Sequence, residues 1–153
     1  MELNRDYKDK SPLFIGVLNG AFMFASDIFK QLEIECEISF IKVSSYKDLS
    51  SSGDVKQLLG LNEPIFKRDV VLLEDIVDSG NTITTLLELM TSLGPQSLEV
   101  ASLLLKPDAL VHDISIKYVG FEIPNDFVVG YGMDYKGLGR NLTDLYQLKT
   151  LTE

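Results

Sequence analysis

The chain has 153 residues, 45% of them hydrophobic, and a formal net charge of −9 at pH 7, which suits one acidic domain with a sizeable core. Its Lys and Arg residues are scattered, and this argues against a nucleic-acid surface, because phosphate contacts need clustered cations. No apolar run approaches the ~20 residues that cross a bilayer, and residues 1–10 lack the order of a secretion signal, so we expect a cytoplasmic protein without membrane partners.

The predicted elements alternate between apolar strands and amphipathic helices. A strand over Leu13–Leu18 is followed by a helix over residues 21–32, with apolar positions at helical spacing, and by a strand over 36–43. A strand over 69–74 is followed by a helix over 82–93, which the pair Gly94-Pro95 ends. Three more strands are predicted over residues 98–106, 116–121 and 126–131. This order predicts a single α/β domain over residues 1–153, with a mostly parallel central sheet flanked by helices.

Residues 44–57 interrupt this alternation with a polar stretch that is rich in Ser and poor in residues that build a core. Such a stretch is most often a mobile surface loop. It is also typical of a lid that closes over a site during turnover. The composition of the stretch alone leaves both interpretations open.

The segment VVLLEDIVDSGNT, residues 70–82, joins a strand to a helix through three acids. Residues 70–73 are all apolar, which is typical of a strand buried on both faces in the middle of a parallel sheet. Glu74, Asp75 and Asp78 therefore crowd the carboxyl end of a core strand, where ligands bind in such sheets. Because clustered like charge costs stability, we expect these acids to serve a site.

The end of the same segment has the properties of a phosphate cup. Residues 79–82 open the next helix, where unpaired N–H groups and the helix dipole favour an anion. Gly80 lets the backbone approach a ligand closely, and the Ser79 and Thr82 hydroxyls can donate to phosphate oxygens. A ribose 5-phosphate would satisfy both halves, with its phosphate in the cup and its hydroxyls on the acid pair. The simpler alternative is that Asp78 or Ser79 only caps the helix.

The segment resembles the phosphoribosyl-diphosphate motif of type I phosphoribosyltransferases, and other segments narrow the resemblance to hypoxanthine (hypoxanthine-guanine) phosphoribosyltransferases. VLNGAFMFASDI (17–28) resembles that family's pyrophosphate loop and following helix, and SSYKDLSSSGDVKQL (44–58) resembles its lid. ASLLLKP (101–107) is similar to the strand that carries its purine-reading lysine, and IPNDFVVGYGMDYKGLGRNL (123–142) to its purine hood. The resemblance covers essentially the whole chain, in the family's order and spacing.

The resemblance implies a type I phosphoribosyltransferase fold with a mobile lid loop and a small purine-binding hood built largely from the C-terminal segment. It implies a purine salvage enzyme that uses Mg2+ to transfer 5-phosphoribosyl from phosphoribosyl diphosphate to N9 of hypoxanthine or guanine. The products would be IMP or GMP and pyrophosphate, and the enzyme would be a homodimer or homotetramer. Two alternatives stay open: a non-catalytic regulator of this fold that senses a nucleotide, and an enzyme that prefers xanthine.

The resemblance also assigns roles around the cup. Asp78 would be the general base beside the purine imidazole nitrogens. Glu74 and Asp75 would hold the ribose hydroxyls, directly or through Mg2+. The phosphoribosyl-binding set is Glu74, Asp75, Asp78, Ser79, Gly80, Asn81 and Thr82, and the metal-binding set is Glu74, Asp75 and Asp134.

The remaining roles concern the purine and the pyrophosphate. Lys106 would donate to the purine O6, which adenine lacks; the alternative is a lysine that extends from a strand end into solvent. Phe127 would stack on the purine, and the backbone of Val128 would meet its edge. The purine-binding set is Lys106, Phe127, Val128 and Asp134, and the pyrophosphate-binding set is Asn19, Gly20, Arg140 and the lid pair Ser45 and Tyr46.

The sequence departs from the family pattern at two places. Asn19 stands where many members carry Lys before Gly20, so pyrophosphate contact there would rest on backbone amides. A non-proline cis peptide is expected in this loop, at Leu18-Asn19 or Asn19-Gly20. Residues 1–10 resemble only the end of a helix that family members carry, so the N-terminus is interpreted as shortened. His112 has no partner pattern for a metal and is interpreted as a surface or structural residue.

Overall fold

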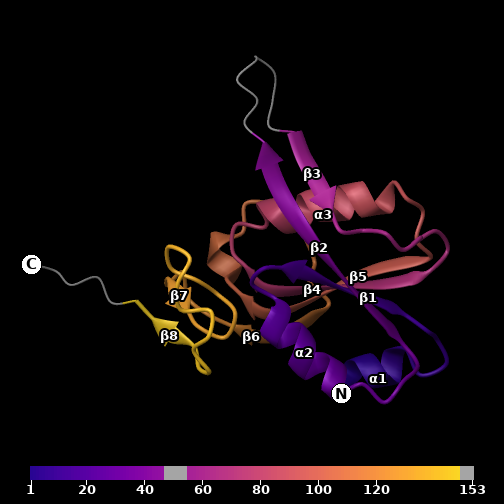
Figure 1. Cartoon of the computed structure of the whole chain (residues 1–153), viewed down its shortest axis with the longest axis horizontal. Helices are drawn as coiled ribbons and strands as arrows, with labels where there is room; N and C mark the ends of the chain where they lie inside the picture. The colour runs from indigo at the N-terminus through magenta and orange to yellow at the C-terminus, as the bar shows by residue number, and fades with distance from the viewer. Residues whose placement is uncertain (47–54, 149–153) are drawn as a thin grey trace, which may run out of the picture.

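The computed structural model describes the backbone of residues 1–46 and 55–148, and the side chains of residues 1–43 and 60–148 (Figure 1). Its main sheet has six strands in the order β3-β2-β1-β4-β5-β6. The strands are β1 (Leu13–Leu18), β2 (Glu37–Tyr46), β3 (Val55–Leu59), β4 (Asp69–Val77), β5 (Ser97–Leu105) and β6 (Tyr118–Glu122). The helices are α1 (Glu2–Asp6), α2 (Phe22–Lys30), α3 (Asn81–Thr91) and the 3-10 turn η1 (Pro107–Ala109). A separate pair, β7 (Val128–Val129) and β8 (Tyr146–Gln147), is antiparallel.

The central sheet is parallel except at one edge. Strand β1 pairs in parallel with β2 and β4, and β5 pairs in parallel with β4 and β6, whereas β3 runs antiparallel to β2. Helices connect the parallel strands because each parallel connection must cross from one end of the sheet to the other. The predicted mostly parallel α/β fold is therefore confirmed.

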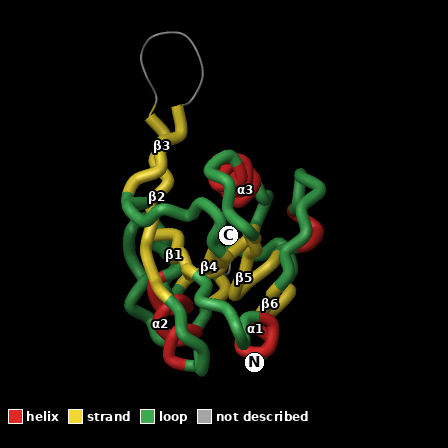
Figure 2. The backbone as a smooth tube through the Cα atoms, turned by 90° about the vertical axis from the view of Figure 1, so that its right-hand side faces the viewer, coloured by secondary structure: helices red, strands yellow, loops and turns green. Residues whose placement is uncertain are grey.

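Two hydrophobic cores lie on opposite faces of the sheet, because successive strand residues point to opposite sides. Leu13, Ile15 and Leu72 pack on one face with buried residues of α3, and Phe14 and Val71 on the other face with residues of α1 and α2. Figure 2 shows the resulting layers, with α3 on one side of the strands and α1 and α2 on the other. Residues 70–73 of β4 are fully buried, as predicted for a central strand.

Two predicted segments differ from the structure. The polar stretch 44–57 was predicted as a loop, but Ser44 to Tyr46 end β2 and pair with the first three residues of β3. Pairing at the edge of a sheet satisfies backbone hydrogen bonds and does not require apolar side chains. The polar composition of the stretch therefore did not indicate a strand. The predicted strand 126–131 is reduced to Val128–Val129, because Gly130 and Tyr131 adopt positive φ angles of 102° and 49°, which strands do not tolerate.

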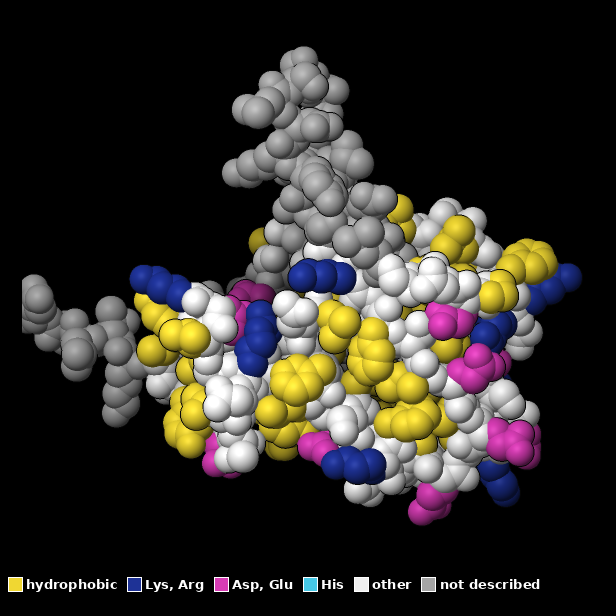
Figure 3. Space-filling model, in the orientation of Figure 1, with side chains coloured by type: hydrophobic (Ala, Val, Ile, Leu, Met, Phe, Trp, Pro, Cys, Tyr) yellow, Lys and Arg dark blue, Asp and Glu magenta, His cyan; other side chains and the backbone are white. Residues whose placement is uncertain are grey.

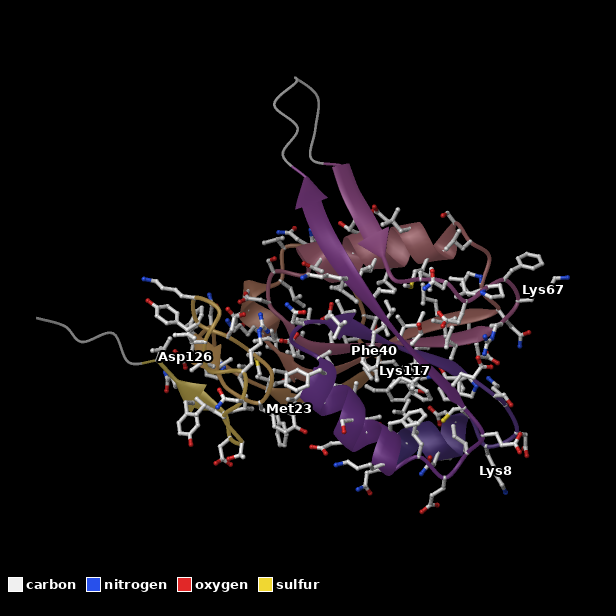
Figure 4. All side chains as sticks on the ribbon, in the orientation of Figure 1. Lys8, Met23, Phe40, Lys67, Lys117 and Asp126 are labelled. Atoms are coloured by element: carbon white, nitrogen blue, oxygen red, sulfur yellow. The ribbon has the colours of Figure 1, made fainter. Side chains whose placement is uncertain are left out.

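The C-terminal segment forms a small hood beside the main sheet, built around β7 and β8 (Figure 1). Gly130 turns the chain back so that its N–H donates to the Met133 carbonyl at 3.0 Å. The hood lies next to the N-terminal end of α2, where Met23 is labelled in Figure 4, and on the opposite side of the molecule from Lys8 and Lys67. The sequence resemblance predicted such a hood from this segment.

Candidate active site

The loop between β4 and α3 forms a small cavity of about 90 Å³, lined by Glu74 and residues 76–83. Gly80 adopts φ +84°, a left-handed conformation that L side chains rarely take, and precedes the first turn of α3. A Cβ at Gly80 would approach Ile114 Cδ1 to 2.9 Å, so both conformation and space favour glycine. A helix therefore begins at this cavity, at the residues predicted to form the phosphate cup.

A second cavity of about 310 Å³ adjoins the cup, since Ile76 and Asp78 line both. It brings together the loop after β1, the carboxyl ends of β4 and β5, and the hood. Most of its lining was predicted from the sequence. The lining residues are Gly20, Asp75, Ile76, Asp78, Lys106, Phe127, Val128, Met133, Asp134 and Arg140.

Glu74 and Asp75 face different cavities, because neighbouring strand residues alternate sides. Glu74 is only 5% exposed, and burial raises its pKa well above the usual value, with the neighbouring Asp75 charge and a hydrogen bond to Asp75 adding to the rise. Burial also raises the pKa of Asp75, against the opposing effect of its backbone hydrogen bonds and of Arg140. Burial thus disfavours the charged form of both carboxyls, and most strongly that of Glu74, the more buried of the two.

Lys106 is buried at the end of β5 and is directed inward. Its Nζ donates to Asp78 Oδ2 at 2.6 Å, and only 5% of the residue is exposed, so it does not extend into solvent. The Asp78 side chain is about half exposed, at 54%. The predicted purine-reading lysine and the predicted general base thus meet across the second cavity.

The hood contributes an ion pair and an aromatic pair. Arg140 donates to Asp134 Oδ1 at 2.5 Å and to the Gly132 carbonyl at 2.7 Å, and these contacts hold both side chains against the turn. Phe127 and Tyr135 pack edge to face with ring centroids 5.7 Å apart. Phe127 is 51% exposed, which leaves room for a flat ligand against its ring.

The loop after β1 packs directly against this site. The Leu18-Asn19 peptide is cis, at one of the two positions predicted from the sequence. A Cβ on Gly20 would lie 1.8 Å from Asp75 Oδ2, and a Cβ on Gly132 would lie 2.1 Å from the Gly20 carbonyl oxygen. A Cβ on Gly132 would therefore collide with backbone, whereas a Cβ on Gly20 would force the Asp75 carboxylate to move. Asn19 is not among the residues that line the cavity.

The carboxylates fit a magnesium ion that is shared with a substrate. Asp75 and Asp134 line the same cavity, whereas Glu74 lines the cup, so the three predicted ligands are not gathered at one point. No group of three metal-binding side chains occurs among the residues that the structure describes. Mg2+ commonly takes only one or two carboxylates and fills its other positions with water and substrate phosphate oxygens, which this donor set allows.

Two further residues complete the comparison with the sequence. The side chains of the lid pair, Ser45 and Tyr46, lie outside the described residues, although their backbone ends β2. His112, predicted to be a surface or structural residue, is exposed and forms a 2.6 Å hydrogen bond between its Nε2 and Asn81 Oδ1 in the cup. No sequence signal links these two residues, which are 31 positions apart.

The face shown in Figure 3 has no surface of the kind that binds nucleic acid. Lys and Arg side chains are dispersed over the face in Figure 3 and do not gather into a basic patch. Within residues 1–46 and 55–148, no helix is both long enough and apolar enough to cross a bilayer.

Comparisons with known proteins agree with this arrangement. The family model of the phosphoribosyl transferase domain matches residues 1–136. The hypoxanthine-guanine phosphoribosyltransferase of Staphylococcus epidermidis is 43% identical over 148 residues, which cover 96% of this chain and 83% of that protein.

Solved structures are similar over nearly the whole chain. The Staphylococcus aureus hypoxanthine phosphoribosyltransferase gives a TM-score of 0.85 at 40% identity, covering 97% of this chain and 81% of the other. A mutant Trypanosoma cruzi hypoxanthine phosphoribosyltransferase, solved as a ternary substrates complex, gives 0.88 at 34% identity, covering 97% and 85%. The chain belongs to the phosphoribosyltransferase family and, within it, to the hypoxanthine-guanine phosphoribosyltransferases.

Proposed function

We propose that this protein transfers 5-phosphoribosyl from phosphoribosyl diphosphate to N9 of hypoxanthine or guanine, and releases pyrophosphate with IMP or GMP. The observation that carries the proposal is the pair of adjoining cavities with Ile76 and Asp78 in the wall between them. The cup suits the 5-phosphate, and the larger cavity suits the purine and the pyrophosphate. Asp78 then lies where the new bond to the sugar forms.

Charged pairs in the larger cavity support an exchange of partners on binding. Lys106 is held by Asp78 at 2.6 Å, and Arg140 by Asp134 at 2.5 Å. A 6-oxopurine offers O6 as an acceptor for Lys106, and pyrophosphate offers oxygens to Arg140. Each new contact releases a carboxylate, so that Asp78 becomes free to accept the purine proton.

The acid pair serves the sugar in this proposal. As the bond to pyrophosphate breaks, positive charge develops on the ribose ring, and carboxylates placed beside the ring stabilise that charge. Asp75, which a Cβ on Gly20 would meet, and Glu74, which lines the cup, are proposed to lie beside this ring. Mg2+ held by Asp75 or Asp134 would neutralise negative charge on the leaving pyrophosphate. Phe127 would stack on the purine, with the Val128 backbone at its edge.

The other parts of the proposal follow from the family. Ser45 and Tyr46 are proposed to close over the pyrophosphate, and the enzyme is proposed to be a cytoplasmic homodimer or homotetramer. No observation favours a nucleotide-sensing regulator without activity. Hypoxanthine, guanine and xanthine all carry the O6 that Lys106 would contact, so all three are included in the assay.

The test is nucleotide formation by purified protein with phosphoribosyl diphosphate, Mg2+ and each purine in turn. We expect turnover of hypoxanthine or guanine and none of adenine. Asp78→Asn keeps the size of the side chain but removes the base, and should slow turnover by about 10²-fold or more. Asp9→Asn is the matched control, because Asp9 is exposed and outside both cavities. The proposal fails if no purine reacts, or if Asp78→Asn reacts as fast as Asp9→Asn.

A further inference from the structure

The segment that follows β5, residues 106–114, runs along the outside of the phosphate cup, and we call it the strap. It is bonded to residues 77–81 in chain order. The Lys106 N–H donates to the Val77 carbonyl at 3.0 Å, and the Val111 N–H donates to the Ser79 carbonyl at 3.0 Å. The side chains add two contacts, from Lys106 to Asp78 and from His112 to Asn81. The strap thereby connects the larger cavity, where the purine is proposed to bind, with the cup.

Apolar contacts hold the strap in this place. Leu110 and Ile114 pack against the core on the α3 side of the sheet. Both also lie within 3.3 Å of the position of a Cβ on Gly80, and His112 Cδ2 lies 3.8 Å from it. The strap is therefore pressed against the backbone of the cup itself.

His112 makes the last contact of the strap with the cup. A carboxamide oxygen can only accept a hydrogen bond, so the Nε2 that meets Asn81 Oδ1 at 2.6 Å carries the hydrogen and donates it. This bond fixes the orientation of the amide. Asn81 also lines the cup. With Oδ1 engaged by His112, the part of the carboxamide that is left for a ligand is the Nδ2 donor, whereas the reversed amide would leave an oxygen that repels phosphate.

We propose that His112 is a positioning residue for the 5-phosphate, acting through the Asn81 amide. The inference rests on the proposed function for the identity of the phosphate ligand. His112 does not touch the ligand in this proposal. It selects the face of an exposed amide, which would otherwise rotate between a donor and an acceptor orientation.

The test compares the binding of IMP and inosine, which differ only in the 5-phosphate, by calorimetry or by competition. His112→Ala should weaken IMP binding about three- to tenfold, as expected for one hydrogen bond, and leave inosine binding unchanged. The KM for phosphoribosyl diphosphate should rise by a similar factor, with kcat changed less. His112→Gln should recover most of the affinity, because its Nε2 can donate to Asn81.

Controls separate positioning from a general effect on the fold. Ser115→Ala changes an exposed residue just past the strap and should alter neither ligand's affinity. In an Asn81→Ala background, His112→Ala should have no further effect on IMP. The inference is overturned if His112→Ala binds IMP normally, if it weakens inosine equally, or if its effect persists without Asn81. Turnover by the wild type tests the proposed function separately, since the binding comparison does not depend on catalysis.

Discussion

The pair formed by Asp78 and Lys106 is asymmetric in burial, and this asymmetry predicts that removing each partner changes stability by a different amount. The Lys106 side chain is 6% exposed and that of Asp78 is 54% exposed. Asp78→Ala leaves a buried ammonium without its anion. Lys106→Met leaves a carboxylate that is already in contact with water, and fills the site with an unbranched apolar chain of similar length.

The expected magnitudes follow from the cost of breaking a buried ion pair, which is about 3–5 kcal/mol when both partners are buried. Solvent already screens Asp78, so we expect Asp78→Ala to lower the free energy of unfolding by about 1–3 kcal/mol. For a chain of this size, this corresponds to a fall in Tm of about 2–12 °C. We expect Lys106→Met to stay within about 1 kcal/mol of the wild type.

The assay is urea denaturation of the ligand-free protein, with the double variant Asp78→Ala/Lys106→Met included. The double variant should be more stable than Asp78→Ala alone, because it no longer buries an unpaired charge. All three variants should lose nucleotide formation, which separates stability from activity. The reasoning is refuted if Lys106→Met is the least stable of the three, or if the double variant is no more stable than Asp78→Ala.

Three further predictions test other parts of the site. Gly20→Ala should raise the KM for phosphoribosyl diphosphate about tenfold or more without unfolding the protein, because its Cβ would displace the Asp75 carboxylate; steady-state kinetics beside a melting curve checks this. Phe127→Ala should weaken IMP binding about three- to tenfold and leave Tm unchanged, because the ring is half exposed and only its stacking is lost; a titration with IMP measures it. Chelation with EDTA should abolish nucleotide formation and added Mg2+ should restore it, whereas activity that persists in EDTA would contradict the metal assignment.

The parallel sheet and the loop that begins α3 could be predicted because their signals are local. The apolar run at residues 70–73 indicates a central strand whatever its neighbours, and Ser79 to Thr82 indicate the opening of a helix in the same way. Lys106 also stood out in the sequence, because a charged side chain at the end of an apolar strand either contacts a ligand or extends into solvent. Its burial and its contact with Asp78 contradict the alternative that it extends into solvent, and its purine-reading role stays a prediction.

The features that sequence did not predict depend on contacts between distant residues. Strand β3 forms because β2 offers an unpaired edge, and the polar residues around Val55–Leu59 give no period that would reveal it. The hood strand is short because Gly130 and Tyr131 turn the chain, and a run of apolar letters hides that turn. His112 reaches Asn81 across 31 positions, so only the folded strap brings them together.

The acids at the end of β4 and in the hood crowd one edge of a core sheet, and two of the four form ion pairs. Asp78 is paired with Lys106 and Asp134 with Arg140, whereas burial raises the pKa of Glu74. Asp75 alone relies on backbone hydrogen bonds and a more distant Arg140. In the proposed reaction, the purine O6 would take over the contact of Lys106, and pyrophosphate oxygens that of Arg140. The two ion pairs thus offset part of the repulsion among these acids before a substrate binds. A bound substrate would then supply the compensating contacts in their place.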